Sequence, residues 1–340
     1  MTTGESFRTL LKRRHSQGLF TCVGLDSEIH EVRRHIPVDR IGSDAEAAAV
    51  FNRKIIEVTH PYACAFKINT SFYEAYRYGF DQAIPLTISH CRSIAPDVPI
   101  IIDGKRGDIG NSMQGYVEML IRLGGDALTC PPGMGEESLL PLLQHDNLEA
   151  FVLCRTSNPG AADFQEGLSF VNQSALQYFV LAKRISIIDE FESLIKQLGW
   201  ELIKSKKSDG YLIPNYQLTA LHIRSWNFPT KSSDWGSRQL RGNCGAVVGA
   251  TATDQIRIVR QILGDDIPIL IPGIGKQGGD LEASIAAGLN KQSTGILINA
   301  SRSIIFAGQP GEDYARAAHD AAKLLHDNIQ RAIAKAYAPN

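Results

Sequence analysis

Residues 101–110 of the chain have the sequence Ile-Ile-Asp-Gly-Lys-Arg-Gly-Asp-Ile-Gly, in which an apolar run leads directly into charged side chains. Residues 98–100 extend the apolar run, which predicts a buried strand ending at the charges. Side chains two apart in a strand share a face, so Asp103 and Lys105 are expected to point the same way, with Asp108 in the following turn. Catalytic residues of parallel α/β proteins gather at such strand ends. The pattern therefore predicts an active site, with a solvated salt-bridge cluster as the alternative.

Length and composition predict a globular protein without a dedicated nucleic-acid or membrane surface. The 340 residues are 44% hydrophobic and 21% charged, which suits one large barrel or two ordinary domains. The formal net charge of -1 argues against a nucleic-acid or anionic-membrane partner. No segment approaches ~18 consecutive apolar residues, and the first residues lack the apolar centre of a signal peptide. We therefore expect a cytoplasmic protein.

Cysteines and histidines give no sign of a metal site. The six cysteines have no C-x-x-C spacing, and the nine histidines are dispersed without an H-E-x-x-H pattern. Four of the cysteines lie within or at the ends of strand-like runs. We predict buried, reduced thiols rather than disulfides or zinc ligands.

Eight strand-like apolar runs alternate with helical segments along most of the chain. The runs are almost continuously apolar, as parallel strands covered on both faces are; they lie at residues 20–25, 63–68, 100–102, 127–130, 150–154, 245–249, 267–271 and 295–299. Helices are predicted over residues 45–58, 112–123, 136–143, 254–263, 280–288 and 313–337. This order predicts an α/β fold, a (β/α)8 TIM barrel that forms one domain over residues 1–340. An open doubly wound sheet shares the local pattern, but no G-x-G-x-x-G turn follows the first strand.

One interval departs from this alternation. After the fifth strand the next strand comes only at Gly245, so we predict an insertion of about residues 168–215 on the barrel surface. Residues 170–199 have helical composition, and residues 204–209 form a polar, basic break. The expected structure is a helical insertion after strand 5, a small hairpin formed by its apolar residues (Leu176, Phe179, Val180, Ile187, Ile188, Phe191, Leu194 and Ile195). We find no catalytic pattern in it.

Further polar residues mark the ends of other strands. Lys67 lies in an apolar strand, where burial is costly unless the charge is paired, and Asp103 on the adjacent strand could pair with it. The alternative is a surface lysine with an extended side chain. The remaining candidates are Asp26, Asn69, Thr156, Ser157 and residues 158–160.

A glycine-rich loop and an arginine indicate a phosphate site. Residues 272–277, Pro-Gly-Ile-Gly-Lys-Gln, follow the seventh strand, and Arg302 follows the eighth. Barrels bind phosphate with backbone N–H groups of these two loops and one cation. Glycine-rich turns alone are weak evidence, but the arginine at the next strand end strengthens the prediction.

Taken together, these motifs resemble the orotidine 5'-phosphate decarboxylase family, in its longer branch. The resemblance covers about residues 7–325 apart from the insertion, and rests on residues 66–69 (Phe-Lys-Ile-Asn), 103–112 (Asp-Gly-Lys-Arg-Gly-Asp-Ile-Gly-Asn-Ser), 156–160 (Thr-Ser-Asn-Pro-Gly), 248–251 (Val-Gly-Ala-Thr) and 272–277. The D-x-K-x-x-D motif also occurs in metal-dependent sugar-phosphate lyases of the same superfamily. The Thr156–Gly160 and P-G-I-G-x-Q segments are more specific to the decarboxylases.

The resemblance implies decarboxylation of orotidine 5'-phosphate to UMP and CO2, the last step of de novo pyrimidine biosynthesis, without a cofactor. The catalytic residues would be a charge tetrad of Lys67, Asp103, Lys105 and Asp108, with Lys105 as the proton donor. In this family Asp108 serves the neighbouring subunit's site, which implies a homodimer. The implied substrate-binding residues are Asp26 and Asn69 near the ribose, Thr156 or Ser157 at the pyrimidine, Ser112, and Gly273, Gly275, Gln277 and Arg302 at the phosphate.

Two other functions remain open. One is a magnesium-dependent sugar-phosphate aldolase or decarboxylase of the same superfamily, in which the carboxylates would bind the metal. The other is a non-catalytic nucleotide-binding barrel, although the presence of all four tetrad residues argues against it.

Overall fold

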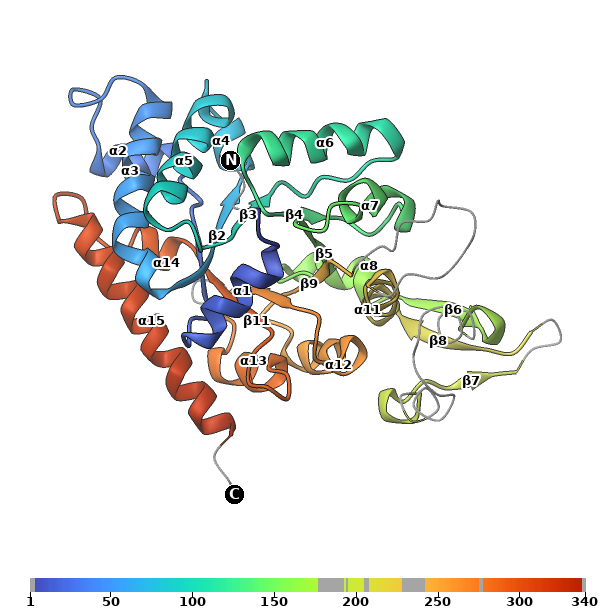
Figure 1. The fold of residues 1–340 in the computed structure, drawn as a ribbon. Helices are drawn as coiled ribbons and strands as arrows, with labels where there is room; N and C mark the ends of the chain where they lie inside the picture. Colours follow the sequence, from blue (N-terminus) through green and yellow to red (C-terminus); the bar gives the residue numbers. More distant parts are fainter. Residues whose placement is uncertain are drawn as a thin grey trace.

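The computed structural model describes residues 4–176, 193, 195–204, 208–227, 242–274 and 278–337. Eight parallel strands close into a barrel with helices around it (Figure 1). In their order around the barrel the strands are β1 (Thr21–Gly24), β11 (Ile296–Ala300), β10 (Ile269–Pro272), β9 (Cys244–Val248), β5 (Glu149–Arg155), β4 (Ala127–Cys130), β3 (Ile100–Asp103) and β2 (Ala63–Asn69). Because β1 pairs with both β2 and β11, the sheet has no open edge. The predicted TIM barrel is confirmed, and all eight predicted strands form it.

Helices between the strands cover the outer face of the barrel. They are α2 (Ile29–His35), α3 (Asp44–Thr59), α4 (Ser71–Glu74), α5 (Ile84–Ile94), α6 (Gly110–Leu123), α7 (Glu136–Leu143), α8 (Ala162–Gln165), α11 (Asn215–Trp226), α12 (Thr253–Leu263), α13 (Leu281–Gly288), α14 (Arg302–Ile305) and α15 (Tyr314–Ala336). Side-chain caps begin several of them: Ser43 accepts a hydrogen bond from the Glu46 N–H, and Asp313 accepts from Ala315 and Arg316. The six predicted helices are present, whereas α2, α4, α5, α8, α11 and α14 were not predicted. In the described part of the chain, no helix is both long and apolar enough to cross a membrane.

The interior of the barrel is apolar at its amino-terminal end. The first helix, α1 (Phe7–Ser16), closes this end, and its Phe7 ring packs edge-on against Phe151 with ring centroids 5.3 Å apart. Phe7 and Leu11 belong to one buried cluster with residues of the strands, whose strand members are Cys22, Cys64, Ala65, Ile101, Ala127, Phe151, Val247, Leu270 and Leu297. We call this cluster the apolar plug. Polar residues farther along the strands lie directly above it.

All six cysteines are buried and free, as predicted. Burial raises the pKa of Cys22 and of Cys130 to about 12, so both stay protonated at neutral pH. The cysteines are therefore packing residues.

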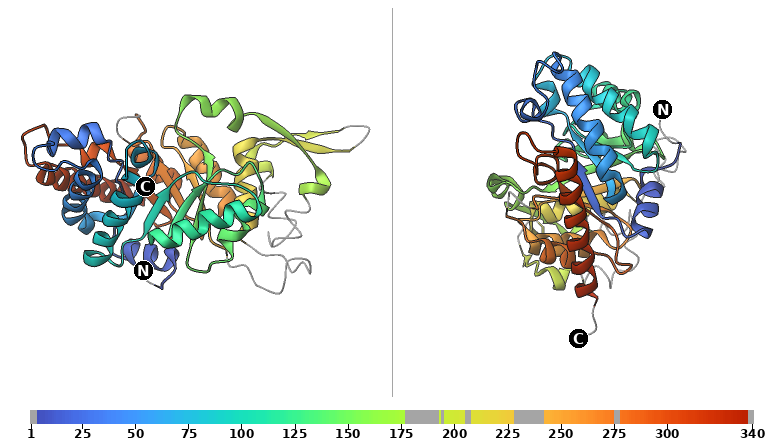
Figure 2. Two further views of the ribbon diagram at one scale, coloured as in Figure 1. Left: turned by 90° about the horizontal axis from the view of Figure 1, so that it is seen from above. Right: turned by 90° about the vertical axis from the view of Figure 1, so that its left-hand side faces the viewer.

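The insertion lies after β5, as predicted, but the described part of it contains a sheet. Strands β6 (Leu168–Asn172), β7 (Leu202–Ile203) and β8 (Gly210–Pro214) pair antiparallel in the order β6-β8-β7. The left view of Figure 2 shows β6 and β8 extending away from the barrel, on the side opposite to α15. At the base of the insertion, the Asn215 N–H donates to the Gly167 carbonyl over 2.8 Å, so the chain leaves and re-enters the barrel at one point.

The helical prediction for residues 170–199 is thus wrong at residues 170–172, which belong to β6. Alternate side chains explain the strand, because Val171 and Ile213 on one face are buried while Phe170 and Leu212 on the other are exposed. Residues 173–176, 193 and 195–198 are helical. The rest of the predicted hairpin, including Phe179, Val180, Ile187, Ile188, Phe191 and Leu194, lies outside the described residues.

Candidate active site

The polar side chains stand one layer above the apolar plug, at the carboxyl ends of the strands. Two residues farther along a strand, the side chain points to the same side. Lys67 therefore follows Ala65 into the barrel, Asp103 follows Ile101, Thr129 follows Ala127, and Asn299 follows Leu297. Together they form the floor of a cavity of about 320 Å³ at the mouth of the barrel.

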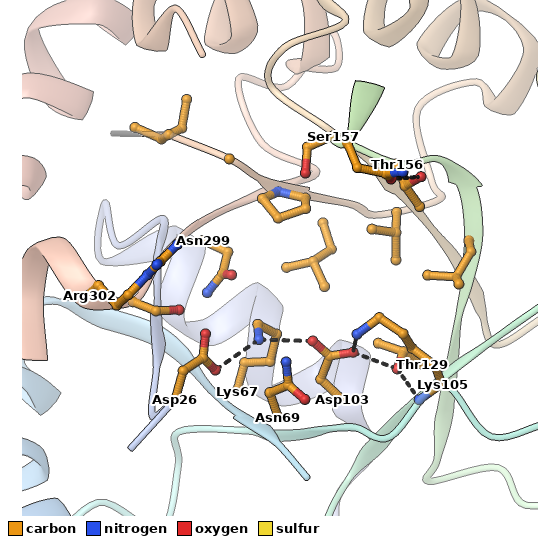
Figure 3. A pocket seen from close by; sticks show the side chains of 18 of the residues that line it. Asp26, Lys67, Asn69, Asp103, Lys105, Thr129, Thr156, Ser157, Asn299 and Arg302 are labelled. Atoms are coloured by element: carbon orange, nitrogen blue, oxygen red, sulfur yellow. Dashed lines mark hydrogen bonds and ion pairs between the residues drawn. The ribbon is translucent and has the colours of Figure 1, made fainter. Parts of the chain in front are cut away.

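This cavity gathers most of the site residues predicted from the sequence (Figure 3). Asp26, Lys67, Asn69, Asp103, Lys105, Thr156, Ser157, Gly273 and Arg302 all line it. Residues far apart in the sequence are thus brought together by the closure of the barrel.

Asp103 is the centre of the polar layer, because its carboxylate accepts three hydrogen bonds. Lys67 Nζ donates to Oδ2 over 3.0 Å, whereas Lys105 Nζ and Thr129 Oγ1 donate to Oδ1, each over 2.8 Å. Lys67 also lies 3.4 Å from Asp26 Oδ1. Negative and positive groups therefore alternate across the cavity floor in the order Asp26, Lys67, Asp103, Lys105, as Figure 3 shows.

Mutual pairing keeps the buried Asp103 and Lys67 charged. Burial alone would raise the pKa of Asp103, but the ammonium groups of Lys67 and Lys105 hold it well below its usual range. Burial alone would lower the pKa of Lys67, but the carboxylates of Asp103 and Asp26 raise it well above its usual range. Asp103 and Lys67 therefore form a buried pair that stays charged at neutral pH.

The two lysines differ in exposure. The side chain of Lys67 is 5% exposed, and that of Lys105 is 49% exposed. Lys67 is thus built into the floor, whereas the ammonium of Lys105 faces the cavity and can meet a bound molecule. Of the two, Lys105 has the geometry of a proton donor.

The loop after β5 forms one wall of the cavity. Thr156 is held by Gln165 of α8, whose Oε1 accepts the Thr156 N–H over 2.7 Å. Gly249, after β9, allows Ser157 to approach closely, since a Cβ at position 249 would lie 2.5 Å from the Ser157 Cα. Thr251 Oγ1 also donates to the Ser157 carbonyl over 3.0 Å. These contacts fix Thr156 and Ser157 opposite the charged floor.

The predicted phosphate end is only partly described. Gly273, with φ of 100°, lines the cavity beside Arg302, the first residue of α14. Within the part of the chain that the structure describes, no carboxylate forms an ion pair with the exposed Arg302 guanidinium, which leaves it available to an anion. Gly275 and Gln277 lie outside the described residues.

Asp108 and Ser112 do not line the cavity of their own chain. Both lie in or after the loop that follows β3, where Asp108 Oδ1 accepts the Ile109 N–H over 2.7 Å. Ser112 is exposed near the start of α6. The other members of the predicted tetrad, Lys67, Asp103 and Lys105, are in direct contact through Asp103.

Sequence analysis missed two residues of the floor, Thr129 and Asn299. Asn299 Nδ2 donates to the Cys22 carbonyl over 3.0 Å, which ties β11 to β1. Both residues lie inside predicted strands, where a threonine or an asparagine carries no distinctive pattern. Counting in steps of two from the apolar interior positions would have found them.

The charged groups of the cavity floor can support proton transfer and electrostatic stabilisation. In the described residues, no group of three His, Cys, Asp or Glu side chains is placed to hold a metal ion. The oxygens of Asp103 are already occupied by three donors. A partly exposed ammonium beside a fixed carboxylate can stabilise and then protonate a carbanion that forms above it.

Comparison with known proteins identifies relatives along almost the whole chain. Residues 22–185 match the orotidine 5'-phosphate decarboxylase / HUMPS family. The chain is similar to orotidine 5'-phosphate decarboxylase of Bordetella pertussis, with 35% identity over 90% of this chain and 91% of the relative. It is also similar to the enzyme of that name from Halobacterium salinarum, with 34% identity over 91% and 92%. Among solved structures, OMP decarboxylase of Leishmania donovani matches with a TM-score of 0.67 and 28% identity, over 96% of this chain and 99% of that one.

Proposed function

Because the chain belongs to the orotidine 5'-phosphate decarboxylase / HUMPS family, we propose that it converts orotidine 5'-phosphate to UMP and CO2. The proposal includes the absence of any cofactor and a place as the last step of de novo pyrimidine biosynthesis. The observation that carries it is the floor of the cavity, where Asp103 is held between a buried lysine and an exposed one.

In the proposed reaction, the bond between C6 of the pyrimidine and the carboxylate breaks, and its electron pair stays on C6. The Lys105 ammonium lies beside that carbon, stabilises the negative charge and donates a proton to it. The neutral amine then regains a proton from solvent. Lys67 keeps Asp103 charged and in place throughout, because it is buried against the same carboxylate.

Contacts away from C6 complete the proposed site. Asp26, Lys67 and Asn69 would bind the ribose hydroxyls, and Thr156 or Ser157 would bind the pyrimidine. Gly273, Gly275, Gln277 and Arg302 would bind the phosphate. Rate accelerations at the upper end for enzymes require roughly 20 kcal/mol of transition-state stabilisation. One lysine cannot supply this amount, so binding energy from ribose and phosphate must contribute.

We further propose that the active form is a homodimer in which Asp108 enters the partner's cavity, with Ser112 beside it. Two observations support this arrangement. Asp108 is outside the cavity of its own chain, although it follows Lys105 by three residues. The loop that carries it is partly exposed, so a second chain could receive it.

The decisive experiment is an assay of the purified chain with orotidine 5'-phosphate and EDTA, followed by loss of substrate absorbance. Steady turnover in EDTA would support the proposal and argue against a magnesium-dependent lyase. Lys105→Ala is the matched control: its turnover should fall by at least about 10²-fold while UMP binding remains. No turnover by the wild-type chain, or normal turnover by Lys105→Ala, would refute the proposal.

A further inference from the structure

Thr129 forms hydrogen bonds with both Asp103 and Lys105 at the cavity floor. It is buried on β4, with 2% of its surface exposed. Its Oγ1 donates to Asp103 Oδ1 over 2.8 Å and accepts the Lys105 backbone N–H over 2.9 Å. A hydroxyl has one proton to give, so its direction is fixed: it donates to the carboxylate and accepts from the amide.

The backbone at Lys105 requires such support. Its φ is +47°, in the left-handed region that residues with a Cβ rarely adopt. The regular pairing of β3 with β4 ends one residue before Asp103, at Ile102 and Leu128. Beyond that point, Thr129 accepts hydrogen bonds from two backbone amides of the loop.

Side chain and backbone of Thr129 act on successive amides. The hydroxyl accepts the Lys105 N–H, and the carbonyl accepts the Arg106 N–H over 3.0 Å. The loop is therefore fixed to the end of β4 at two adjacent positions. One of these two bonds depends on the threonine side chain.

We propose that Thr129 is a positioning residue for the decarboxylation proposed above: its hydroxyl fixes the left-handed turn at Lys105 and the orientation of the Asp103 carboxylate. Through these two contacts it sets where the Lys105 ammonium stands. The expected kinetic effect rests on the proposed function, but the two hydrogen bonds of the Thr129 hydroxyl do not depend on the substrate.

Replacing Thr129 by serine or by valine separates the role of the hydroxyl from that of side-chain shape. Serine would keep the hydroxyl, and valine would keep the shape while placing a methyl group against a carboxylate and an amide. The amide and one carboxylate oxygen would each lose a partner in Thr129→Val. The effect should fall on the turnover number, because the ammonium acts on charge that exists mainly in the transition state.

The test compares Thr129→Val, Thr129→Ser and a matched control in the same barrel. Thr21 on β1 is also buried, and its Oγ1 has no hydrogen-bond partner in the described structure. Thr21→Val therefore measures the general effect of removing a buried threonine hydroxyl. We expect Thr129→Val to lower kcat by roughly 10- to 100-fold, with KM and the Kd for UMP within about threefold of wild type. Thr129→Ser should recover most of kcat, and Thr21→Val should match wild type.

A second readout does not depend on turnover. Hydrogen–deuterium exchange of the peptide covering residues 104–109 should be faster in Thr129→Val than in wild type, Thr129→Ser or Thr21→Val. Unchanged kcat or unchanged exchange in Thr129→Val would overturn the inference. So would a loss in Thr129→Ser equal to that in Thr129→Val. If the valine variant does not fold, Thr129→Ser decides by itself: it keeps the hydroxyl, so a loss of kcat of about tenfold or more would overturn the inference, and kcat and exchange close to wild type would support it. An inactive wild-type chain would refute the proposed function, while the exchange result would still decide whether the hydroxyl holds the loop.

Discussion

At the scale of single residues, the two lysines that contact Asp103 differ in how far they can reach a bound molecule. Asp103 has its oxygens occupied by three donors, and Lys67 is buried against it, so neither can move far without leaving a charge unpaired. Lys105 shares the same carboxylate from a half-exposed position. A buried ion pair with a half-exposed ammonium beside it suits the proton delivery proposed above.

Arg302→Ala should weaken the binding of phosphorylated ligands specifically. A hydrogen bond to a charged group contributes about 1.5–3 kcal/mol, so the Kd for UMP should rise by roughly 10- to 100-fold. Affinity for the nucleoside orotidine, which has no phosphate, should barely change. Titration calorimetry with both ligands measures the difference.

Arg34→Ala serves as the control for Arg302→Ala. Arg34 and Arg302 both line a second, polar hollow, but Arg34 does not line the main cavity. Arg34 forms a 2.7 Å ion pair with Glu31. It should leave both affinities unchanged. Equal weakening of UMP and orotidine by Arg302→Ala would mean that Arg302 supports the fold rather than the phosphate.

His15 should make stability fall as the pH drops from 6.5 to 4. Burial lowers the pKa of His15 from 6.5 to about 4, and its Nε2 donates to the Ile296 carbonyl over 3.0 Å. The unfolded chain thus binds a proton in this range that the folded chain excludes, so stability is full above pH 6.5 and is lost toward pH 4. The loss amounts to roughly 3 kcal/mol.

His15→Gln, which retains a donor for Ile296, should remove that part of the pH dependence. Urea unfolding at pH 7 and at pH 4.5 gives the comparison. Because burial also lowers the pKa of His35, His60, His90 and His326, the variant should keep a shallower slope. A slope equal to that of wild type would contradict the assignment to His15.

The charged residues could be predicted from the sequence because they interrupt apolar strands, where charge is rare. Lys67 and Asp103 are examples, and their placement in one cavity follows from barrel closure. Thr129 could not be predicted, because threonine is an ordinary strand residue and its role depends on the left-handed turn at Lys105. The place of Asp108 is also beyond the sequence pattern, since a loop position does not define whether the side chain serves its own chain or a partner.

At the scale of elements, the barrel strands were predictable because both of their faces are buried. The helix α11 was missed because the insertion precedes it, which hid its place after the fifth strand. The sheet of the insertion was missed because its strands are short and carry exposed apolar residues, Phe170 and Leu212 among them. Such residues in a surface segment match helix and strand patterns equally well.

The two faces of β8 should respond differently to truncation. Ile213 is fully buried in the main core, whereas its neighbour Leu212 is 38% exposed. Ile213→Ala should lower the free energy of unfolding by about 2–5 kcal/mol. Leu212→Ala should stay within about 0.5 kcal/mol of wild type. Urea unfolding of both variants measures the contrast, and equal effects would mean that Ile213 is not packed in the core.

At the scale of the whole molecule, the proposed dimer makes each cavity depend on two chains. Neither Lys105→Ala nor Asp108→Ala should then work alone. In a mixed dimer, one cavity collects both lesions, while the other combines an intact Lys105 with an intact Asp108. With random exchange about half of the dimers are mixed, so activity should return to roughly a quarter of wild type.

The mixing experiment needs proof that subunits exchange, for example by mass spectrometry of differently labelled chains. If Asp108 acted within its own chain, every cavity would retain one lesion. Mixing the two variants would then restore no activity even after complete exchange.

The narrow base of the insertion also has a consequence for how the barrel folds. Strand β5 must pair with β9, bringing residue 150 beside residue 244 across the longest connection in the barrel. If β6 and β8 pair early, the hydrogen bond between Asn215 and Gly167 joins the two ends of the insertion and removes residues 168–214 from that connection. The effective loop is then roughly halved, which lowers its closure entropy cost by about 0.6 kcal/mol. The inserted sheet thus offsets, in the search of β5 and β9 for each other, the length that the insertion adds to the chain.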